Sequence, residues 1–486
     1  MKFLIDCTRP MYDQTSGEFM GTRDEQYIYN NENSEITDTK DKLINVRSMG
    51  RPNNSGRKLT AGDRSGDVIK PISVDLPGKK SREIRVLKIQ LGLSCNYSCE
   101  YCSQRFVPNI EHANTKYMNL FLKNLDNWLA KPPQKIEFWG GEPFVYWKIL
   151  KPLAESLREK YPETRFSVIT NGSMITDEII DWLYDMGFSM AVSHDGPGQN
   201  VRGPDPFEDR EQRKMLFKLF NRFLPEGRIS INSMIHRENM DREKIQKFFE
   251  ELFNLTPDQP FTIGEGGFID VYDEGGRKNV PQNLEEHIAH RRTTLQAIRN
   301  NSINRFGVLQ SRLMEWTESW ATYRESNTIG QKCGMDSEDT IAVDLQGNVV
   351  TCQNVTAVSQ APNGKSHKIG HVNQFDNIKL NTATHWKFRE ECSKCPVLQV
   401  CKGSCMFLEG EYFKLSCDAA YSDHVPFFAA AFEAATNGAM PYRIRALDET
   451  SEGYMLPADR EDIWGAINQV APKQIETRTV AVDKNF

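Results

Sequence analysis

Apolar and polar residues alternate from about residue 82 in a pattern that predicts strands separated by amphipathic helices. Arg85 to Leu91 alternates as a strand does, and apolar residues then recur at helical spacing from Met118 to Ala130. The same order recurs, with strands expected at 135–139, 166–170, 189–193, 228–235 and 260–269 and helices at 147–160, 177–186, 209–223 and 241–255. Six strands that alternate with helices predict an α/β fold in which a parallel sheet curves into a partial (β/α)6 TIM-like barrel.

The segments on either side of this alternation have other patterns. Residues 1–81 are polar and rich in Asn, Gly, Pro and Asp, so we expect short strands and loops there. Two long amphipathic helices are predicted at 284–301 and 304–326, a hairpin at 341–351, and a short apolar helix at 425–435. The expected domains are an N-terminal extension of unclear fold (1–81), the barrel (82–327), a cysteine-rich domain (328–425), and a helix with a polar tail (426–486).

Composition excludes several classes of function. The chain has 486 residues, a net charge of −6 and 39% hydrophobic residues, so no basic footprint for a nucleic-acid backbone is evident. No apolar run approaches the roughly 20 residues that span a membrane, and charge interrupts the first residues too early for a signal peptide. We therefore expect a cytoplasmic protein. Its eleven cysteines then favour metal or redox ligation over disulfides.

Three cysteines come after the first predicted strand of the barrel. Cys95, Cys99 and Cys102 are spaced Cys-x3-Cys-x2-Cys on one short loop. Three thiolates can hold three irons of a cubane cluster, and they leave the fourth iron without a protein ligand. The alternative is a zinc knuckle, which would bring a fourth Cys or His within a few residues, and none occurs in 103–109.

This motif resembles that of the radical S-adenosylmethionine (SAM) enzymes, including the aromatic Tyr101 before the last cysteine. The resemblance implies a [4Fe-4S] cluster whose open iron is chelated by SAM. It further implies reductive cleavage of SAM to a 5′-deoxyadenosyl radical that takes hydrogen from a substrate, with electrons from a donor such as flavodoxin or ferredoxin. Cys95, Cys99 and Cys102 would then be both the metal ligands and the catalytic residues.

Polar residues end the next three predicted strands, where barrel active sites lie. Each could be an ordinary turn, but their order matches the resemblance. The resemblance implies that Gly140, Gly141 and Glu142 hold the SAM amino group. Thr170 or Asn171, together with Ser193, would contact the ribose and the carboxylate of SAM. Arg202 would pair with that carboxylate, and Tyr101 would also lie at the cofactor. For His194 we expect a hydrogen-bonded structural role. Glu265 is expected near the barrel mouth, either facing a substrate or in a turn.

Seven further cysteines lie within 85 positions of each other: Cys333, Cys352, Cys392, Cys395, Cys401, Cys405 and Cys417. Their spacing resembles the SPASM extension of radical SAM enzymes, which implies two auxiliary [4Fe-4S] clusters. The first would use Cys392, Cys395, Cys401 and Cys417, and the second would use Cys333, Cys352 and Cys405. The second set has three thiols, so we expect either an open iron or a ligand other than Cys. The alternative is a zinc ribbon, but seven ligands do not divide into two closed tetrahedral sets. Cys7 stands alone and is expected to be an ordinary small residue at the end of a short strand.

The resemblance implies a peptide or protein substrate, because most SPASM relatives act on one. The outcome could be a crosslink, an epimerised residue or an oxidation. Sulfatase-type maturation is disfavoured, because those relatives carry an aspartate where this chain has Gln353. Residues 1–81 also lack the winged pattern of a fused leader-peptide-binding domain. Two alternatives remain: a radical SAM enzyme acting on a small metabolite or nucleotide, and a non-catalytic iron–sulfur electron carrier or scaffold, against which the intact Gly140 to Pro143 motif argues.

Overall fold

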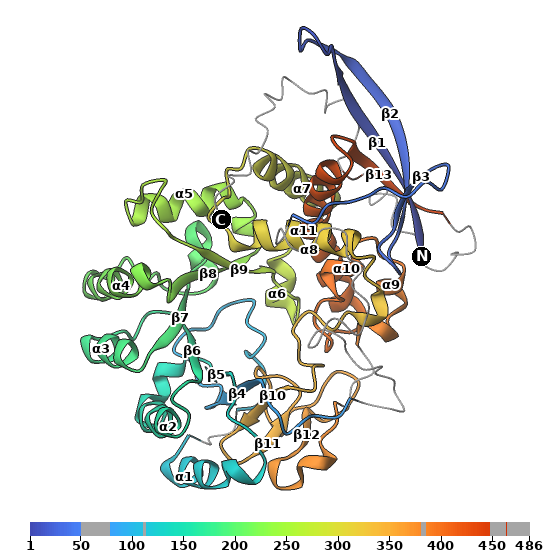
Figure 1. The fold of residues 1–486 in the computed structure, drawn as a ribbon. Coiled ribbons are helices and arrows are strands. Elements are labelled where there is room, and N and C mark those ends of the chain that lie inside the picture. Colours follow the sequence, from blue (N-terminus) through green and yellow to red (C-terminus); the bar gives the residue numbers. More distant parts are fainter. Residues whose placement is uncertain (50–77, 110–112, 381–384, 448–462, 464–486) are drawn as a thin grey trace.

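A curved parallel sheet forms the centre of the molecule (Figure 1). The computed structural model of the chain describes residues 1–49, 78–109, 113–380, 385–447 and 463. The six predicted barrel strands are present and pair in parallel in chain order: β4 (Val86–Gln90), β5 (Lys135–Trp139), β6 (Arg165–Thr170), β7 (Phe188–Ser193), β8 (Ile229–Ile235) and β9 (Ile263–Phe268). The predicted α/β barrel is therefore confirmed, with bounds that differ from the expected ones by three residues or fewer.

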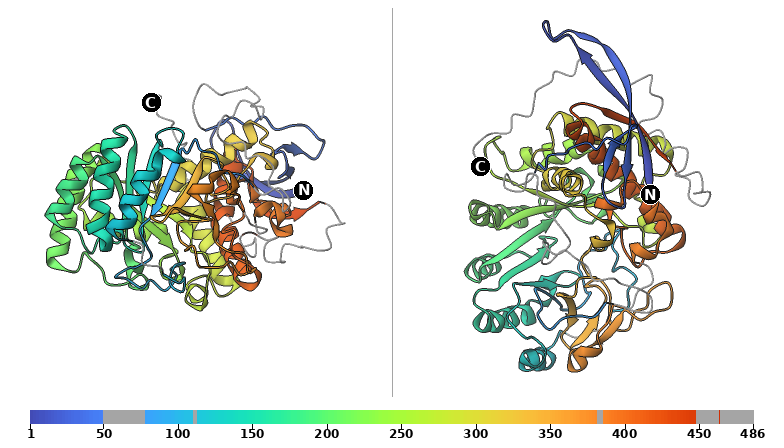
Figure 2. Two further views of the ribbon diagram at one scale, coloured as in Figure 1. Left: turned by 90° about the horizontal axis from the view of Figure 1, so that it is seen from below. Right: turned by 45° about the vertical axis from the view of Figure 1, so that its right-hand side comes forward.

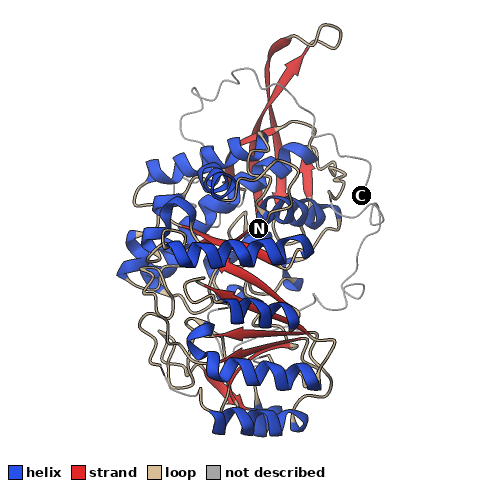
Figure 3. Cartoon of the chain, turned by 90° about the vertical axis from the view of Figure 1, so that its left-hand side faces the viewer, coloured by secondary structure: helices blue, strands red, loops and turns tan. Residues whose placement is uncertain are grey.

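Helices cover the convex face of this sheet, and Figure 3 shows them stacked in front of the strands. They are α1 (Thr115–Asn124), α2 (Trp147–Lys160), α3 (Asp177–Asp185), α4 (Arg210–Phe223) and α5 (Arg242–Leu252). Side chains that precede α3, α4 and α5 accept hydrogen bonds from the first turn, which fixes where each helix begins. Helix α1 ends earlier than predicted, because residues 125–127 tighten into a 3₁₀ turn.

The sheet does not close into a full barrel. The free edge of β4 pairs in parallel with β10 (Thr340–Asp344), which continues into antiparallel β11 (Asn348–Val350) and β12 (Lys368–His371). The predicted hairpin is thus confirmed. Since β10 pairs directly with the first barrel strand, the cysteine-rich region shares one nine-stranded sheet with the barrel.

A second sheet joins the two ends of the described chain, in the order β13-β1-β2-β3. Its strands are β1 (Lys2–Tyr12), β2 (Phe19–Asn30), β3 (Ile36–Asp38) and β13 (Met440–Ala446), and the β1–β2 hairpin projects from the body of the molecule (Figures 1 and 2). The expectation of short strands was wrong here, since β1 and β2 have 11 and 12 residues. Cys7 is buried within β1 and not at its end. The predicted polar tail contains β13, and its residues 448–462 and 464–486 lie outside the described residues.

Helices from the second half of the chain pack between the two sheets. The predicted pair is confirmed as α7 (Leu284–Arg299) and α8 (Gly307–Ala321), preceded by the short α6 (Glu274–Lys278). The expected short apolar helix is instead α11 (Gly410–Ala435), which has 26 residues and carries Cys417. Two one-turn helices, α9 (Glu390–Ser393) and α10 (Leu398–Cys401), lie in the segment that carries three further cysteines. Within the described ranges, no helix has the length and apolar content needed to cross a bilayer.

Candidate active site

The loop that carries Cys95, Cys99 and Cys102 leaves the carboxyl end of β4 at the mouth of the barrel. Cys95 is exposed, and the other two cysteines are half-buried. Hydrogen bonds fix the loop: the Tyr97 N–H donates to Cys95 Sγ over 3.4 Å, and the Cys102 N–H donates to the Cys99 carbonyl over 3.1 Å. Burial raises the pKa of Cys99 to about 12, against the opposing charge of Arg202. Ligation of a metal cluster would therefore have to release this thiol proton.

Gly141 brings the loop after β5 into direct contact with the cysteine loop. The Gly141 N–H donates to Gly92 O over 3.2 Å, and the Glu142 N–H donates to Ser94 O over 3.0 Å. A Cβ atom on Gly141 would lie 2.4 Å from Leu93 O, so no larger residue fits. The resemblance implied that Gly141 helps to hold the SAM amino group. In the structure, the groups packed against Gly141 belong to the cysteine loop.

Glu142 joins the ends of β5 and β6. Its carboxylate is buried and accepts hydrogen bonds from Phe144 N (3.1 Å), Thr170 Oγ1 (2.9 Å) and Asn171 N (2.7 Å). Burial raises the pKa of Glu142 to about 7, although these three hydrogen bonds act in the opposite direction. A carboxylate has about four acceptor positions. Since the protein fills three of them, one is left for a donor such as a ligand ammonium.

Asn171 connects the end of β6 to the cysteine loop. Its Nδ2 donates to Asn96 Oδ1 over 2.8 Å, and Asn96 Nδ2 donates to Ser173 Oγ over 2.7 Å. Ser193 is buried at the end of the next strand, β7. The structure thus brings two of the predicted SAM-contacting residues, Glu142 and Asn171, into direct contact with the cysteine loop.

Asp195 is the centre of a buried network that sequence reasoning missed. Its Oδ1 accepts from Arg202 Nη2 over 3.1 Å and from Met234 N over 2.9 Å, and its Oδ2 accepts from the Tyr101 hydroxyl. Burial raises the pKa of Asp195, but Arg202 and His236 outweigh it and hold the pKa well below its usual value. The seven-residue spacing of Asp195 and Arg202 was the available signal. It could not show that the pair is buried.

Arg202 keeps one hydrogen-bonding group free. Its Nε is buried without a partner among the residues that the structure describes. The guanidinium lies within electrostatic range of Cys95, Cys99 and Cys102. An unpaired N–H of a cation beside the cysteine loop fits an anionic group such as the SAM carboxylate.

Two other residues have structural roles. His194 Nδ1 accepts from Gly196 N over 3.0 Å, so Nε2 carries the proton and donates to Asp205 Oδ1 over 3.0 Å, in agreement with the expected role. Glu265 faces neither a substrate nor a turn. It lies within β9, and its buried carboxylate pairs with Arg242 Nε at 2.6 Å. A charged residue flanked by glycines in the sequence gave no sign of this partner, which lies 23 residues earlier.

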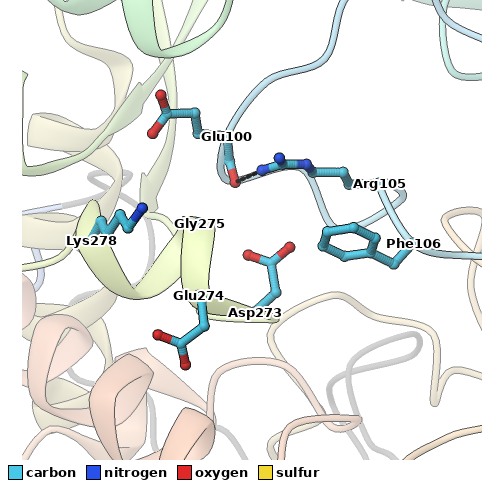
Figure 4. A pocket seen from close by; sticks show the side chains of 7 residues that line it. All are labelled: Glu100, Arg105, Phe106, Asp273, Glu274, Gly275 and Lys278. Atoms are coloured by element: carbon cyan, nitrogen blue, oxygen red, sulfur yellow. Dashed lines mark hydrogen bonds between the residues drawn. The ribbon is translucent and has the colours of Figure 1, made fainter.

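A charged cavity of about 320 Å³ lies directly beside the cysteine loop, between it and α6 (Figure 4). The cavity is lined by Glu100, Arg105, Phe106, Asp273, Glu274, Gly275 and Lys278. Arg105 donates to Glu100 O over 3.3 Å, and the Asp273 side chain points toward the space in front of the Phe106 ring. The cavity therefore offers both positive and negative groups within reach of the cysteine loop.

The second cysteine group falls into the two predicted sets. Cys392, Cys395, Cys401 and Cys417 line one cavity together with Phe413 and Gly403. Burial raises the pKa of Cys392, and the charges of the other three thiols raise it further. A Cβ on Gly403 would lie 3.3 Å from Cys392 Sγ, so the backbone closes tightly over the sulfurs. Four convergent thiols around one enclosed space fit a four-cysteine cluster.

Cys333, Cys352 and Cys405 form the other set. The Cys352 thiol is within electrostatic range of both Cys333 and Cys405, and Lys88 on β4 supplies a positive charge nearby. Across the described ranges, no three His, Cys, Asp or Glu side chains are arranged to hold a single metal ion. A closed structural zinc site has four ligands, whereas this set has three thiols, which match three corners of a cubane cluster.

Comparison with known proteins identifies the barrel. The sequence profile of the Radical SAM superfamily matches residues 89–249, from β4 through most of α5. This match identifies residues 89–249 as a radical SAM domain. The cysteine spacing of the C-terminal region resembles that of a SPASM extension.

Several known proteins are similar to this chain. The radical SAM cyclopropyl synthase TigE of Paramaledivibacter caminithermalis is 20% identical over 365 residues, which is 67% of this chain and 68% of TigE. The cysteine-type anaerobic sulfatase-maturating enzyme of Clostridium perfringens is 23% identical over 64% of this chain and 85% of its own length. A solved structure of native anSMEcpe with bound AdoMet and the Cp18Cys peptide has a TM-score of 0.52 at 18% identity, and the match covers 72% of this chain and 99% of that one. This likeness shows a shared fold.

Proposed function

We propose that this radical SAM enzyme cleaves SAM reductively at a cluster held by Cys95, Cys99 and Cys102 and uses the resulting radical to modify a peptide or protein side chain. The observation that carries the proposal is the arrangement around the cysteine loop. One free acceptor position on Glu142 and one free N–H on Arg202 flank three cysteines that leave an iron open. These two groups suit the ammonium and the carboxylate of one amino acid moiety.

The residues of this chain bind and orient the cofactor. The cluster, when bound, would supply the electron that splits the sulfonium. Glu142 would accept from the SAM amino group, Arg202 would pair with its carboxylate, and Thr170, Asn171 and Ser193 would line the remainder of the site with Tyr101. Gly140 and Gly141 hold the cysteine loop against β5, so their contribution to binding is to fix its position.

Two auxiliary [4Fe-4S] clusters complete the proposed set of cofactors. The four thiols that line one cavity fit the first cluster. Cys333, Cys352 and Cys405 fit three corners of the second. Gln104 Nε2, two residues after Cys102, donates to Asn354 Oδ1 over 3.0 Å, so the loop after Cys352 contacts the cysteine loop directly. A substrate radical formed there would lie close to a potential electron acceptor. An external reductant such as flavodoxin or ferredoxin would supply electrons for SAM cleavage.

The peptide class of substrate is supported by relatives. One is named a putative peptide biosynthesis protein, YydG of Bacillus subtilis, 23% identical over 179 residues. The solved structure of anSMEcpe contains a peptide. The charged cavity between Glu100 and Lys278 is open to a side chain beside the cysteine loop. Formation of formylglycine in a sulfatase is disfavoured, because Gln353 comes directly after Cys352 and its amide cannot serve as a base.

The test is to incubate the cluster-loaded enzyme, SAM and dithionite with peptides encoded by short open reading frames beside its gene. We expect a peptide that loses hydrogens by mass spectrometry, or that takes up solvent deuterium at one residue. The matched control is Cys99→Ala, which should leave the peptide unchanged. If small metabolites or nucleosides are modified and no peptide is, the peptide assignment is wrong while SAM cleavage stands.

A further inference from the structure

The three-cysteine set leaves one corner of its proposed cluster without a thiol. Cys333 lies in the loop before β10, Cys352 comes after β11, and Cys405 lies in the loop before α11. In the described part of the chain, the other nearby cysteines are those of the four-cysteine cavity. The fourth iron must therefore be open or bound by another kind of side chain.

Tyr272 lies at this corner. It comes after β9 in the loop that leads to α6, and its hydroxyl is directed toward Cys405 Sγ, with Cys352 also within electrostatic range. Tyr272 packs with Cys405 in the same apolar cluster. The hydroxyl therefore lies at Cys405, on an element that none of the cysteines occupies.

The backbone on both sides of Tyr272 is fixed. The Val271 N–H donates to Ser416 Oγ on α11 over 2.7 Å, and Asp273 Oδ1 caps α6 by accepting from Gly276 N over 2.9 Å. Asp270 accepts from Ser404 Oγ, next to Cys405. These anchors place the phenol between the last barrel strand and the cysteine-rich region.

Two other side chains lie near the set, Lys88 and Asp336. Lys88 is a cation that pairs with Glu137 at 3.4 Å, and it has no lone pair for iron while protonated. Asp336 is the main rival, because it neighbours Cys333 and its Oδ1 is buried without a partner among the described residues. Its Oδ2, however, accepts from Gln331 N (2.7 Å) and pairs with His385 Nε2 (2.8 Å). These contacts fix Asp336 through Oδ2 in the loop that carries Cys333, whereas Tyr272 reaches Cys405 from a separate element.

We propose that the Tyr272 oxygen is the protein ligand of the fourth iron in the cluster held by Cys333, Cys352 and Cys405. An iron–oxygen bond forms, the phenol O–H bond breaks, and the proton passes to solvent with no change in oxidation state. This proposal rests on the auxiliary clusters of the proposed function. With that iron closed, a substrate does not chelate it and must be held elsewhere. We assign it to the charged cavity, whose residue Asp273 directly follows Tyr272 in the chain.

The experiment uses the full chain carrying Cys95→Ala, Cys99→Ala and Cys102→Ala, reconstituted without oxygen, so that only auxiliary clusters contribute to the spectra. The probe is ¹³C-cyanide, whose carbon couples to an open cluster iron in electron–nuclear double resonance spectra of the reduced protein. With Tyr272 present we expect no ¹³C coupling. The Tyr272→Phe variant should keep its iron and gain that coupling. Cyanide bound while Tyr272 is in place, or identical spectra for the two proteins, would overturn the proposal.

Controls separate ligation from packing. Tyr412→Phe removes a hydroxyl from the same apolar cluster, one that bonds Glu274 at 3.2 Å, and should leave the spectra unchanged. If the ¹³C coupling appears in the Asp336→Asn variant and not in Tyr272→Phe, Asp336 is the ligand of the fourth iron and the proposal is wrong. If Tyr272→Phe loses one cluster's iron, Tyr272→Cys should restore it, and failure to restore it counts against ligation. This experiment does not depend on SAM cleavage, so a failure of the proposed SAM chemistry would be detected in a separate assay.

Discussion

Arg202 and Asp195 form a buried ion pair, with Nη2 and Oδ1 3.1 Å apart. Asp195 also accepts from the hydroxyl of Tyr101, which lies between Cys99 and Cys102, and from Met234 N on β8. One carboxylate thus ties the cysteine loop to the ends of two barrel strands and orients the arginine beside it. The guanidinium is held in place before any ligand arrives, which reduces the ordering cost of binding.

The first prediction concerns Arg202. Arg202→Gln removes the charge that we assign to the SAM carboxylate, and a hydrogen bond to a charged group contributes about 1.5–3 kcal/mol. We therefore expect the Kd for SAM to rise about tenfold or more, as measured by anaerobic calorimetry. Arg213→Gln is the control, because Arg213 is a solvent-accessible arginine on α4 that stacks on Phe217. Unchanged SAM affinity in a cluster-loaded Arg202→Gln variant would refute the assigned role.

The second prediction concerns Gly141. In Gly141→Ala the new methyl would lie 2.4 Å from Leu93 O and 2.5 Å from Ser94 O, so the cysteine loop must move. We expect this variant to lose the iron of one cluster and the ability to cleave SAM, while the iron of the proposed auxiliary clusters remains. Iron analysis measures this loss. Gly307→Ala, whose Cβ would meet nothing closer than 3.6 Å, should retain all its iron. If Gly141→Ala retains it too, the loops do not depend on this contact.

The barrel strands and the cysteine motifs could be recognised in the sequence because their signals are local. Each barrel strand and its helix show their own period, and Cys392 to Cys405 carry a fixed spacing. The convergence of Cys417 with Cys392 was implied by family resemblance, and the structure places both around one cavity. The predicted and observed bounds of β5 are identical, because the strand is buried on one face and flanked by turns.

Long-range partners could not be predicted. Strand β1 pairs with β13, more than 400 residues away, and neither pattern specifies the other. The same holds for buried charges. The sequence does not show that Glu265 and Asp423 are buried, or that both pair with Arg242 in the folded protein. Tyr272 is a further example, because nothing in its neighbourhood marks it as facing Cys405.

The third prediction concerns the buried ion network between the barrel and α11. Asp423 pairs with Arg242 at 2.5 Å and with Arg312 at 2.8 Å, and His290 lies 3.2 Å away. Asp423→Asn removes the negative charge that two buried arginines share, and breaking such a buried ion pair costs about 3–5 kcal/mol. Thermal unfolding should show a markedly lower Tm. Glu433→Gln breaks the half-exposed pair with Arg299 on the same helix and should cost about 0–1 kcal/mol.

The same network predicts a pH dependence. Burial raises the pKa of Asp423, but Arg242 and Arg312 outweigh it and hold the pKa well below the ordinary 3.8. A carboxyl with a depressed pKa in the folded state contributes stability above its unfolded pKa and loses it as the pH falls through the folded value. The difference in Tm between wild type and Asp423→Asn should therefore be constant from pH 7 to about 5 and shrink below pH 3.8. A difference that shrinks already between pH 7 and 5 would contradict the assignment.

The central claim is that Cys95, Cys99 and Cys102 hold a cluster that splits SAM. The most direct measurement is the release of 5′-deoxyadenosine from SAM by the dithionite-reduced, cluster-loaded protein, quantified by liquid chromatography and mass spectrometry. We predict release by the wild type and none by Cys99→Ala, with the auxiliary iron retained in both. If the fully loaded wild type releases no 5′-deoxyadenosine, or if Cys99→Ala releases as much, the claim is wrong.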